Sequence, residues 1–200
     1  MSFVCICRRW ALAVLTVALA ACASADRKPV PLAKVDLEQV YGGWYIVATM
    51  PNMLERGVVE SYDHYAPRPG GIREDYFMRR GGFERKRQHF TVDIDVRPGS
   101  GNADWRVKPI WPVRLAFQVL WVDPDGRFLL FGEQDRNWGW IYSRQQRISD
   151  PDYAAMLGRF GALGYDTTKF RKTVQFPEQI GQPGFWSDGV HRSAAKAAPG

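Results

Sequence analysis

Apolar and polar side chains alternate through the middle of the chain, and this alternation predicts short strands. It is clearest over residues 88–96, where Phe90, Val92, Ile94 and Val96 share one face. Turns rich in Pro, Gly, Asn or Asp separate the runs closely enough for neighbouring strands to pair antiparallel. We expect strands over residues 42–50, 58–66, 71–79, 88–96, 104–109, 114–122, 127–132, 138–144 and 169–175. This spacing indicates an all-β barrel or sandwich.

One helical pattern interrupts the strands late in the chain. Ser149 is a suitable N-cap, and Pro151 fits the first helical turn. Apolar residues then recur at helical spacing and predict a helix with one buried face: Tyr153, Met156, Leu157, Phe160 and Leu163. Gly164 is the expected C-terminal cap.

The first residues are typical of a secretory signal peptide. Arg8 and Arg9 precede an uncharged run of 11 residues, 10–20, which is too short to span a membrane. Leu19-Ala20-Ala21-Cys22 resembles the lipobox of bacterial lipoproteins. The resemblance implies that residues 1–21 are removed and that Cys22 carries acyl chains such as palmitate. An ordinary signal peptide, cut after Ala21 with an unmodified Cys22, is the alternative.

In lipoproteins of this kind, a residue other than Asp after the Cys favours export to the outer membrane. Ala23 occupies that position, so we expect a periplasm-facing outer-membrane anchor. The other cysteines, Cys5 and Cys7, lie in the predicted signal, which leaves the mature chain no pair for a disulfide. Composition then predicts three zones after the signal: an acylated N-terminus and tether over residues 22–36, a domain over 37–176, and a partly disordered tail over 177–200. The side chains of Phe185 and Trp186 could dock this tail on the domain.

Residues at both ends of the predicted domain resemble the lipocalin family. Gly42-Gly43-Trp44 resembles the Gly-x-Trp signature of the first lipocalin strand, and Glu55-Arg56-Gly57 follows it as in bacterial lipocalins and apolipoprotein D. Trp140-Ile141-Tyr142-Ser143-Arg144 resembles the last barrel strand. The middle signature is degraded, since only Asp123 of a Thr-Asp-Tyr-like turn is kept. The resemblance implies an eight-stranded antiparallel up-and-down barrel with a C-terminal helix and a ninth strand, and such a barrel leaves room for one small ligand.

The signature residues Trp44 and Arg144 have a physical role that does not depend on the family. They would lie on adjacent first and last strands, where a guanidinium on the face of an indole ring contributes about 0.5–2 kcal/mol. We expect this pair to close one end of the barrel.

The ligand-binding residues follow from strand parity once Trp44 is taken to face inward. The expected lining is Ile46, Ala48, Glu74, Tyr76, Met78, Phe90, Val92, Trp105, Phe117 and Trp140. Strand 114–122 is apolar on both faces, so its parity stays open. Such a lining suits an acyl chain, and the resemblance implies a fatty acid or lysophospholipid. A barrel filled by its own aromatic side chains is the alternative.

Glu74 would be the acidic group of this lining. A carboxylate inside the barrel would disfavour free fatty acids relative to lysophospholipids with a cationic head, because like charges repel in a low dielectric. If the parity of this strand is shifted by one, Glu74 faces water, and Arg73, Asp75 and Phe77 face inward.

The chain shows little that points to catalysis. Its three histidines do not have metal-ligand spacing, and we expect no metal and no cofactor. Asp63, Asp93 and Asp95 could do acid–base work, but we interpret them as polar residues of exposed strand faces. A structural envelope lipoprotein and a lipid-modifying enzyme are the alternatives to ligand binding.

Without Arg8 and Arg9 of the predicted signal, the net charge falls from +6 to a mild +4, and basic residues are concentrated over residues 73–87. They are typical either of contact with anionic lipid heads or of a solvated hairpin. Export argues against nucleic acid as a partner, and a homodimer is left open.

Overall fold

The computed structural model describes residues 28–107 and 115–191. From Pro31 onward these residues form one compact unit. The predicted signal peptide, the lipobox and Cys22 lie outside the described residues, so their assignment stays a prediction.

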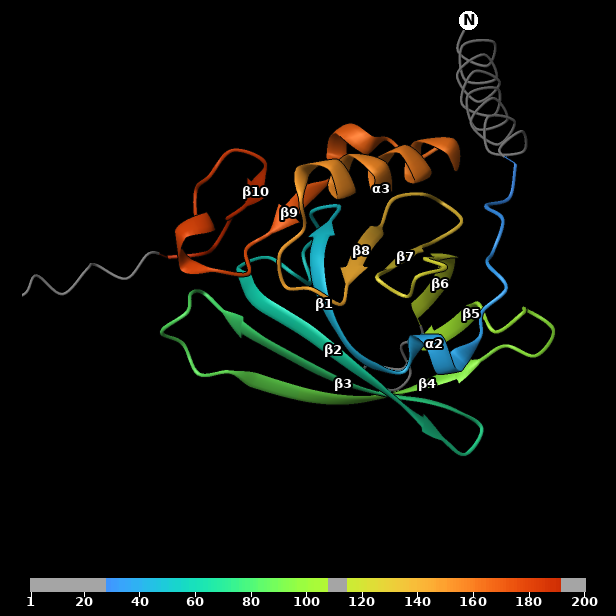
Figure 1. The fold of residues 1–200 in the computed structure, drawn as a ribbon. Helices are drawn as coiled ribbons and strands as arrows, with labels where there is room; N and C mark the ends of the chain where they lie inside the picture. Colours follow the sequence, from blue (N-terminus) through green and yellow to red (C-terminus); the bar gives the residue numbers. More distant parts are fainter. Residues whose placement is uncertain (1–27, 108–114, 192–200) are drawn as a thin grey trace, which may run out of the picture. The chain divides into compact units, whose positions relative to one another are not determined.

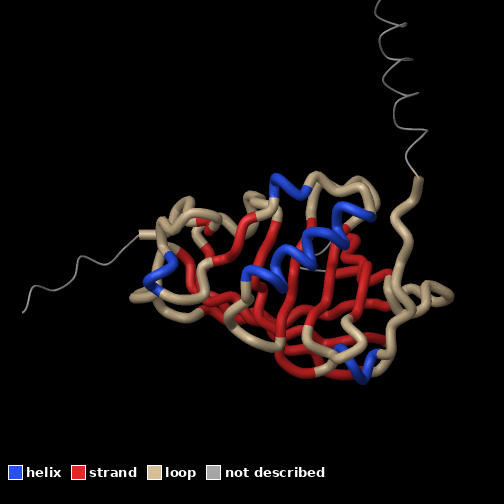
Figure 2. The backbone as a smooth tube through the Cα atoms, turned by 45° about the horizontal axis from the view of Figure 1, so that its top comes forward, coloured by secondary structure: helices blue, strands red, loops and turns tan. Residues whose placement is uncertain are grey.

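The central element is an antiparallel barrel of eight strands, each paired with the next, that closes because β8 pairs back with β1 (Figures 1 and 2). The prediction of an eight-stranded up-and-down barrel is confirmed. The strands are β1 (Gly42–Thr49), β2 (Val58–Arg68), β3 (Gly71–Arg80), β4 (Gln88–Val96), β5 (Asp104–Val107), β6 (Leu115–Val122), β7 (Phe128–Gly132) and β8 (Gly139–Ser143). Their bounds follow the alternation of the sequence to within a few residues.

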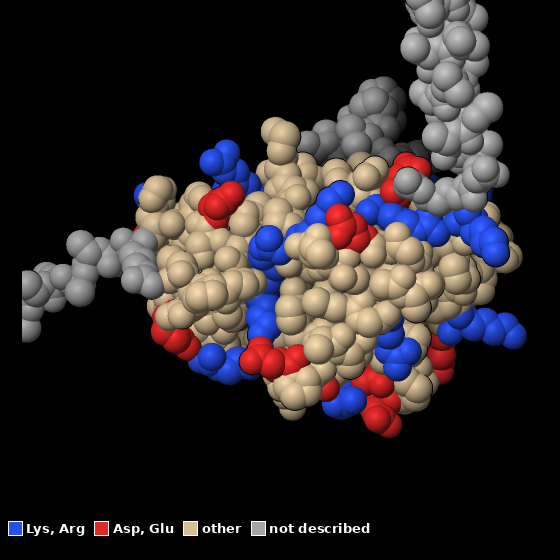
Figure 3. Space-filling view, turned by 90° about the horizontal axis from the view of Figure 1, so that it is seen from above, with Lys and Arg blue, Asp and Glu red and all other residues tan. Residues whose placement is uncertain are grey.

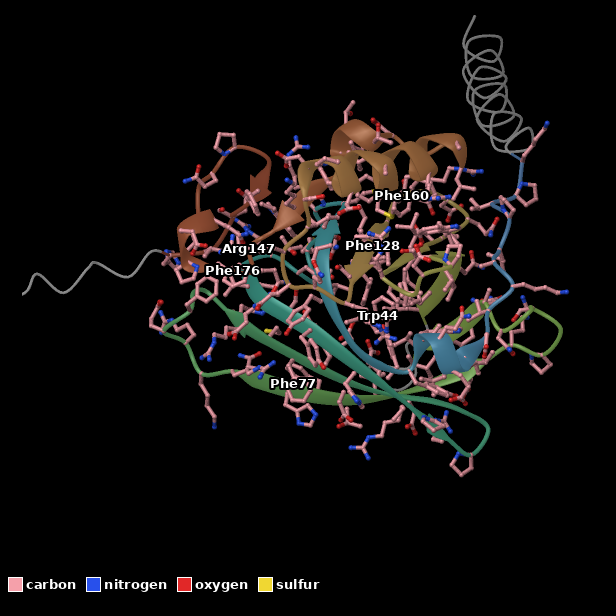
Figure 4. All side chains as sticks on the ribbon, viewed as in Figure 1. Trp44, Phe77, Phe128, Arg147, Phe160 and Phe176 are labelled. Carbon is pink, nitrogen blue, oxygen red and sulfur yellow. The ribbon has the colours of Figure 1, made fainter. Side chains whose placement is uncertain are left out.

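Helix α3 (Asp150–Ala162) lies over the outer face of the barrel beside β1, β7 and β8 (Figure 1). The Ser149 side chain accepts a hydrogen bond from the backbone N–H of Asp152, as the sequence predicts for an N-cap. Phe160 is fully buried and points toward the sheet (Figure 4), with its ring 4.5 Å from that of Phe170. A Cβ on Gly139 would come within 2.7 Å of the Phe170 ring, so only glycine fits beneath this helix.

Seen from the side of α3, acidic and basic side chains are interspersed on the surface (Figure 3). Ion pairs join α3 to its surroundings here: Lys172 pairs with Asp150, and Arg127 lies 3.6 Å from Asp152.

The sheet continues beyond the barrel on one side of β1. A 3-10 helix η1 (Thr167–Lys169) leads into β9 (Arg171–Thr173), and η2 (Pro177–Gln179) leads into β10 (Phe185–Trp186), which pairs parallel with β9. Ile180 packs with Val59 and Val174. Residues 177–191 of the predicted tail therefore fold onto the barrel unit, and Phe185 and Trp186 dock there by pairing with β9. Residues 192–200 lie outside the described part, so the predicted partial disorder stays a prediction.

The last residues of the predicted tether belong to the barrel unit. The N–H of Ala33 donates to the carbonyl of Val119, and the N–H of Val35 donates to that of Gly101. A short helix that the sequence did not predict, α2 (Leu37–Val40), follows at the closed end of the barrel, with Asp36 as its N-cap. The segment that could act as a tether therefore ends before Ala33.

Bulges change which residues face inward on two of the strands that line the barrel. In β1 the pairing with β8 shifts between Ile46 and Ala48, and in β6 the pairing with β7 shifts between Val119 and Trp121. Val119 therefore packs inside the barrel, whereas Trp121 lies outside under the guanidinium of Arg159 from α3. Strand β6 is apolar on both faces because the helix covers its outer face.

Candidate functional site

One end of the barrel is closed by the signature pair. The Arg144 guanidinium lies 3.7 Å from the centre of the Trp44 ring and donates to the carbonyls of Gln39, Tyr41 and Gly43 at 2.9 Å each. The Trp44 indole N–H donates to the carbonyl of Val40, so helix α2 is tied to the same plug (Figure 4). These contacts are the closure that the sequence predicts for the two residues.

A layer of aromatic rings fills the barrel next to this closure. The Trp105 ring packs edge-on against Tyr65 at 5.3 Å and against Phe131 at 5.2 Å. All three side chains are fully buried. The closed end of the barrel is therefore solid, which leaves room for a ligand only toward the other end.

Above this layer the barrel holds a cavity of about 180 Å³ that is open toward solvent. Its wall is mostly aliphatic and aromatic but includes three carboxylates. The lining residues are Ile46, Leu54, Glu55, Asp63, Glu74, Tyr76, Val107, Leu115, Ala116, Phe117, Trp138, Trp140 and Tyr142. Leu54 and Trp138 come from the loops at the open end, which we call the mouth.

Asp63 and Glu74 form the floor of the cavity. They lie on the inner faces of β2 and β3, and the next inward residues toward the closed end, Tyr65 and Ile72, already belong to the solid core. Asp63 is only 1 % exposed. The Tyr65 hydroxyl lies 3.4 Å from Oδ2 of Asp63.

Burial sets the charge of this pair. Loss of hydration raises the pKa of Glu74 to about 7, although hydrogen bonding to Asp63 and Tyr65 opposes the rise. Burial and then the charge of Glu74 raise the pKa of Asp63 well above its usual range, against hydrogen bonds from the Tyr142 and Tyr65 hydroxyls. Because the two groups interact strongly, they titrate as a unit.

The third carboxylate lies near the mouth and holds an aromatic wall in place. Glu55 accepts a hydrogen bond from the Trp140 indole N–H at 2.7 Å and from the Asn52 amide at 3.1 Å. Burial raises its pKa, opposed by these hydrogen bonds and by the nearby Arg80. Phe117 packs 4.8 Å from Trp140, so the hydrogen bond also fixes the rings on that side of the cavity.

Half of the ligand-binding residues expected from the sequence line this cavity: Ile46, Glu74, Tyr76, Phe117 and Trp140. The structure thus selects the inward parity of Glu74, and the alternative set Arg73, Asp75 and Phe77 faces outward. The cavity lining does not include Met78, which is buried, Val92, which is partly exposed, or Trp105, which belongs to the solid core.

The expected inward placement of Ala48 is wrong, and Phe90 does not line the cavity. The bulge after Ile46 turns Ala48 to the outer face, opposite Ile141, and brings Thr49 opposite Trp140 on the inside. Phe90 has the inner parity and stacks near Tyr76 at 6.4 Å, but it is 47 % exposed and lies outside the cavity. Strand β4 extends past the cavity there, so inward parity does not bring burial.

Asp63, Glu55 and Tyr142 line the cavity but are not among the ligand-binding residues expected from the sequence. The interpretation of Asp63 as an exposed strand residue is wrong, because it alternates with Tyr65 on the inner face of β2. That alternation was the available signal. Glu55 is part of the Glu55-Arg56-Gly57 motif and lies in a loop, where strand parity gives no information.

Among residues 28–107 and 115–191, no three or more His, Cys, Asp or Glu side chains cluster as metal ligands would. In the same residues, no helix has the length and apolar character needed to cross a membrane.

Comparisons with known proteins agree with this geometry. Residues 35–175 match the family model of the lipocalin-like domain. The chain is 28 % identical over 163 residues to temperature-induced lipocalin-1 of Arabidopsis thaliana, and the match covers 75 % of this chain and 85 % of that protein. It is also 28 % identical over 141 residues to outer membrane lipoprotein Blc of Escherichia coli, covering 68 % and 76 % of the two chains.

Solved structures share the fold at much lower sequence identity. Insecticyanin of the tobacco hornworm Manduca sexta superposes with a TM-score of 0.59 at 15 % identity, over 79 % of this chain and 89 % of that one. Apocrustacyanin C2 superposes with a TM-score of 0.57 at 15 % identity, over 70 % and 80 %. At this identity the likeness is one of fold.

Proposed function

Since this chain belongs to the family of lipocalin-like domains, we propose that it is a lipid-anchored lipocalin whose barrel holds a fatty acid or lysophospholipid for storage or transport. Binding of small hydrophobic molecules is the property that the family supports. The observation that carries the proposal is the open cavity, because the wall around its three carboxylates is aliphatic and aromatic. An acyl chain is the common ligand element that buries such a wall.

Extraction and mass spectrometry of the purified protein test the proposal. We expect a lipid to copurify with the wild type and to be lost from Leu115→Trp, because the larger ring would fill the cavity beside Phe117. Met53→Trp is the matched control, since Met53 is 93 % exposed and does not line the cavity. An empty wild-type barrel would favour a structural envelope lipoprotein instead, and turnover of added lipid would favour an enzyme.

The anchor is the second part of the proposal. The lipobox-like residues before Cys22 and the similarity to an outer membrane lipoprotein support acylation of Cys22 and an outer-membrane location facing the periplasm. Two or three acyl chains hold a protein stably at a bilayer, because each buried methylene contributes about 0.8 kcal/mol. A lipocalin held in this way would take up its ligand close to the membrane that supplies it.

A further inference from the structure

We propose that the floor of the cavity binds the cationic nitrogen head of an amphiphile, an ammonium or quaternary ammonium group, with the aliphatic chain directed toward the mouth. This inference rests on the proposed function, in that the cavity must first accept an aliphatic chain. It assigns the two floor carboxylates, Asp63 and Glu74, to recognition of the head group.

One oxygen of the floor pair has no donor. The hydroxyls of Tyr65 and Tyr142 lie near Asp63, but no described residue is placed to donate a hydrogen bond to its buried Oδ1, and the side chain lines the cavity. Leaving a buried acceptor unpaired costs free energy. A ligand head that carries a positive charge or a hydrogen-bond donor would remove that cost.

The charge of the floor has no counter-charge among the described lining residues. Among the described lining residues there is no Lys, Arg or His. Asp104, a buried carboxylate elsewhere in the barrel, lies 3.2 Å from the Arg97 guanidinium and 2.9 Å from that of Arg106. Buried carboxylates normally have such partners. None of the described lining residues gives the floor pair such a partner, which leaves the position for a cation from a ligand.

An aromatic wall bounds the same cavity. Tyr76, Tyr142, Phe117 and Trp140 line the cavity together with the floor carboxylates. The Phe117 ring lies 4.8 Å from Trp140 and 6.4 Å from Tyr142, so several ring faces and edges bound the same space. Aromatic faces attract ammonium groups and bind quaternary ammonium ions in particular. A carboxylate head placed on the same floor would instead meet like charge in a low dielectric.

The charge of the floor predicts the pH dependence of binding. The groups that face the pair are the hydroxyls of Tyr65, Tyr76 and Tyr142 and the carboxyl of Glu55, while Asp75 acts from the outer face. Burial raises the pKa of the three tyrosines well above 10, so they stay neutral. A cation should therefore bind more tightly as pH rises through about 7, where Glu74 loses its proton. By linkage, its binding near pH 7 should release protons.

Matched twelve-carbon probes, used below their critical micelle concentrations, test the head-group preference by titration calorimetry with delipidated full-length protein. At pH 8 we expect dodecyltrimethylammonium to bind at least about tenfold more tightly than dodecanoate, and dodecanol to lie between them. Dodecylphosphocholine distinguishes the two possible sources of the cationic head, a phosphocholine lipid and a simple ammonium amphiphile. Binding as tight as that of dodecyltrimethylammonium indicates a phosphocholine lipid, and weaker binding indicates a simple ammonium amphiphile; both support the proposal.

Glu74→Gln and Asp63→Asn should each reduce the preference for the cation over dodecanoate at least about fivefold, and Glu74→Gln should reduce the proton release. Asp75→Asn, the next residue of the same strand but on its outer face, is the matched control and should leave the preference unchanged. Equal affinity for all heads, or a preference that survives both floor variants, would overturn the inference while leaving the proposed function intact. If none of the probes binds, the proposed function fails and the inference fails with it.

Discussion

Replacing Glu74 by glutamine should make the protein more stable at neutral and alkaline pH. The carboxyl has a pKa of about 7 in the folded protein because it is buried, against an ordinary value of 4.5. Between these two values the folded chain binds more protons than the unfolded chain, so stability is present at low pH and falls as pH rises from about 4.5 to about 7. Glutamine keeps the shape of the side chain but has no charge to bury, so the variant should not show this fall.

The size of the effect follows from the same two values. The difference between 7 and 4.5, at about 1.4 kcal/mol for each pH unit, gives about 3 kcal/mol as an upper limit. Water that enters the cavity screens the charge, so we expect a gain of about 1–3 kcal/mol in the free energy of unfolding at pH 8. Near pH 4.5 wild type and variant should be equally stable. Removing the charge also relieves the repulsion on Asp63, which acts in the same direction.

Urea unfolding of ligand-free protein, followed by tryptophan fluorescence between pH 4.5 and 8, measures the difference. Asp75→Asn is the control with the opposite sign, because hydrogen bonds from Thr91, and then from His89 and Arg73, lower the pKa of Asp75 to about 2. Loss of the Asp75 carboxylate should lower the free energy of unfolding at neutral pH. If Glu74→Gln is no more stable than wild type at pH 8, or gains as much at pH 4.5, the carboxylate is not buried as the structure places it.

Three further changes test the anchor, the closure and the helix packing. Cys22→Ser should release the protein into the soluble periplasmic fraction, and full retention in membranes would contradict the lipid anchor. Trp44→Ala and Arg144→Ala should each lower the free energy of unfolding by about 2–4 kcal/mol. The double variant should lose about 0.5–2 kcal/mol less than the sum of the two single losses, and full additivity would mean that the Trp44 ring and the Arg144 guanidinium do not interact. Gly139→Ala should cost about 1–3 kcal/mol, because its Cβ would lie 2.7 Å from a buried ring, whereas Gly158→Ala on the exposed face of α3 should be neutral or stabilising in the same denaturation assay.

Local sequence was enough to predict the strands, the main helix and the family. Alternation marks each strand, because successive side chains of a strand point to opposite faces wherever it lies. Ser149 caps α3 through a bond to a residue three positions on, so this helix start is also a local property. The signature residues Trp44 and Arg144 could be paired in advance because an up-and-down order makes the first and last strands neighbours.

Other features depended on contacts that local sequence does not record. Phe185 and Trp186 pair with β9, so part of the segment that composition predicts to be a tail belongs to the sheet. Helix α2 forms where Trp44 and Arg144 bond to its carbonyl groups, and four residues are too short to be stable or recognisable alone.

The cavity itself was decided by the tertiary structure. Strand parity placed Glu74 correctly because β3 is regular around it, but a bulge in β1 exchanged Ala48 for Thr49, and a bulge leaves no clear mark in the residues that form it. Asp63 shares one face of β2 with Tyr65, but its polar side chain is more typical of an exposed strand position. It is buried because the barrel closes around it and the aromatic layer of Tyr65, Trp105 and Phe131 blocks one end. The sequence alone therefore determined the kind of barrel, while the charge at its floor depends on which side chains the closed barrel shields from water.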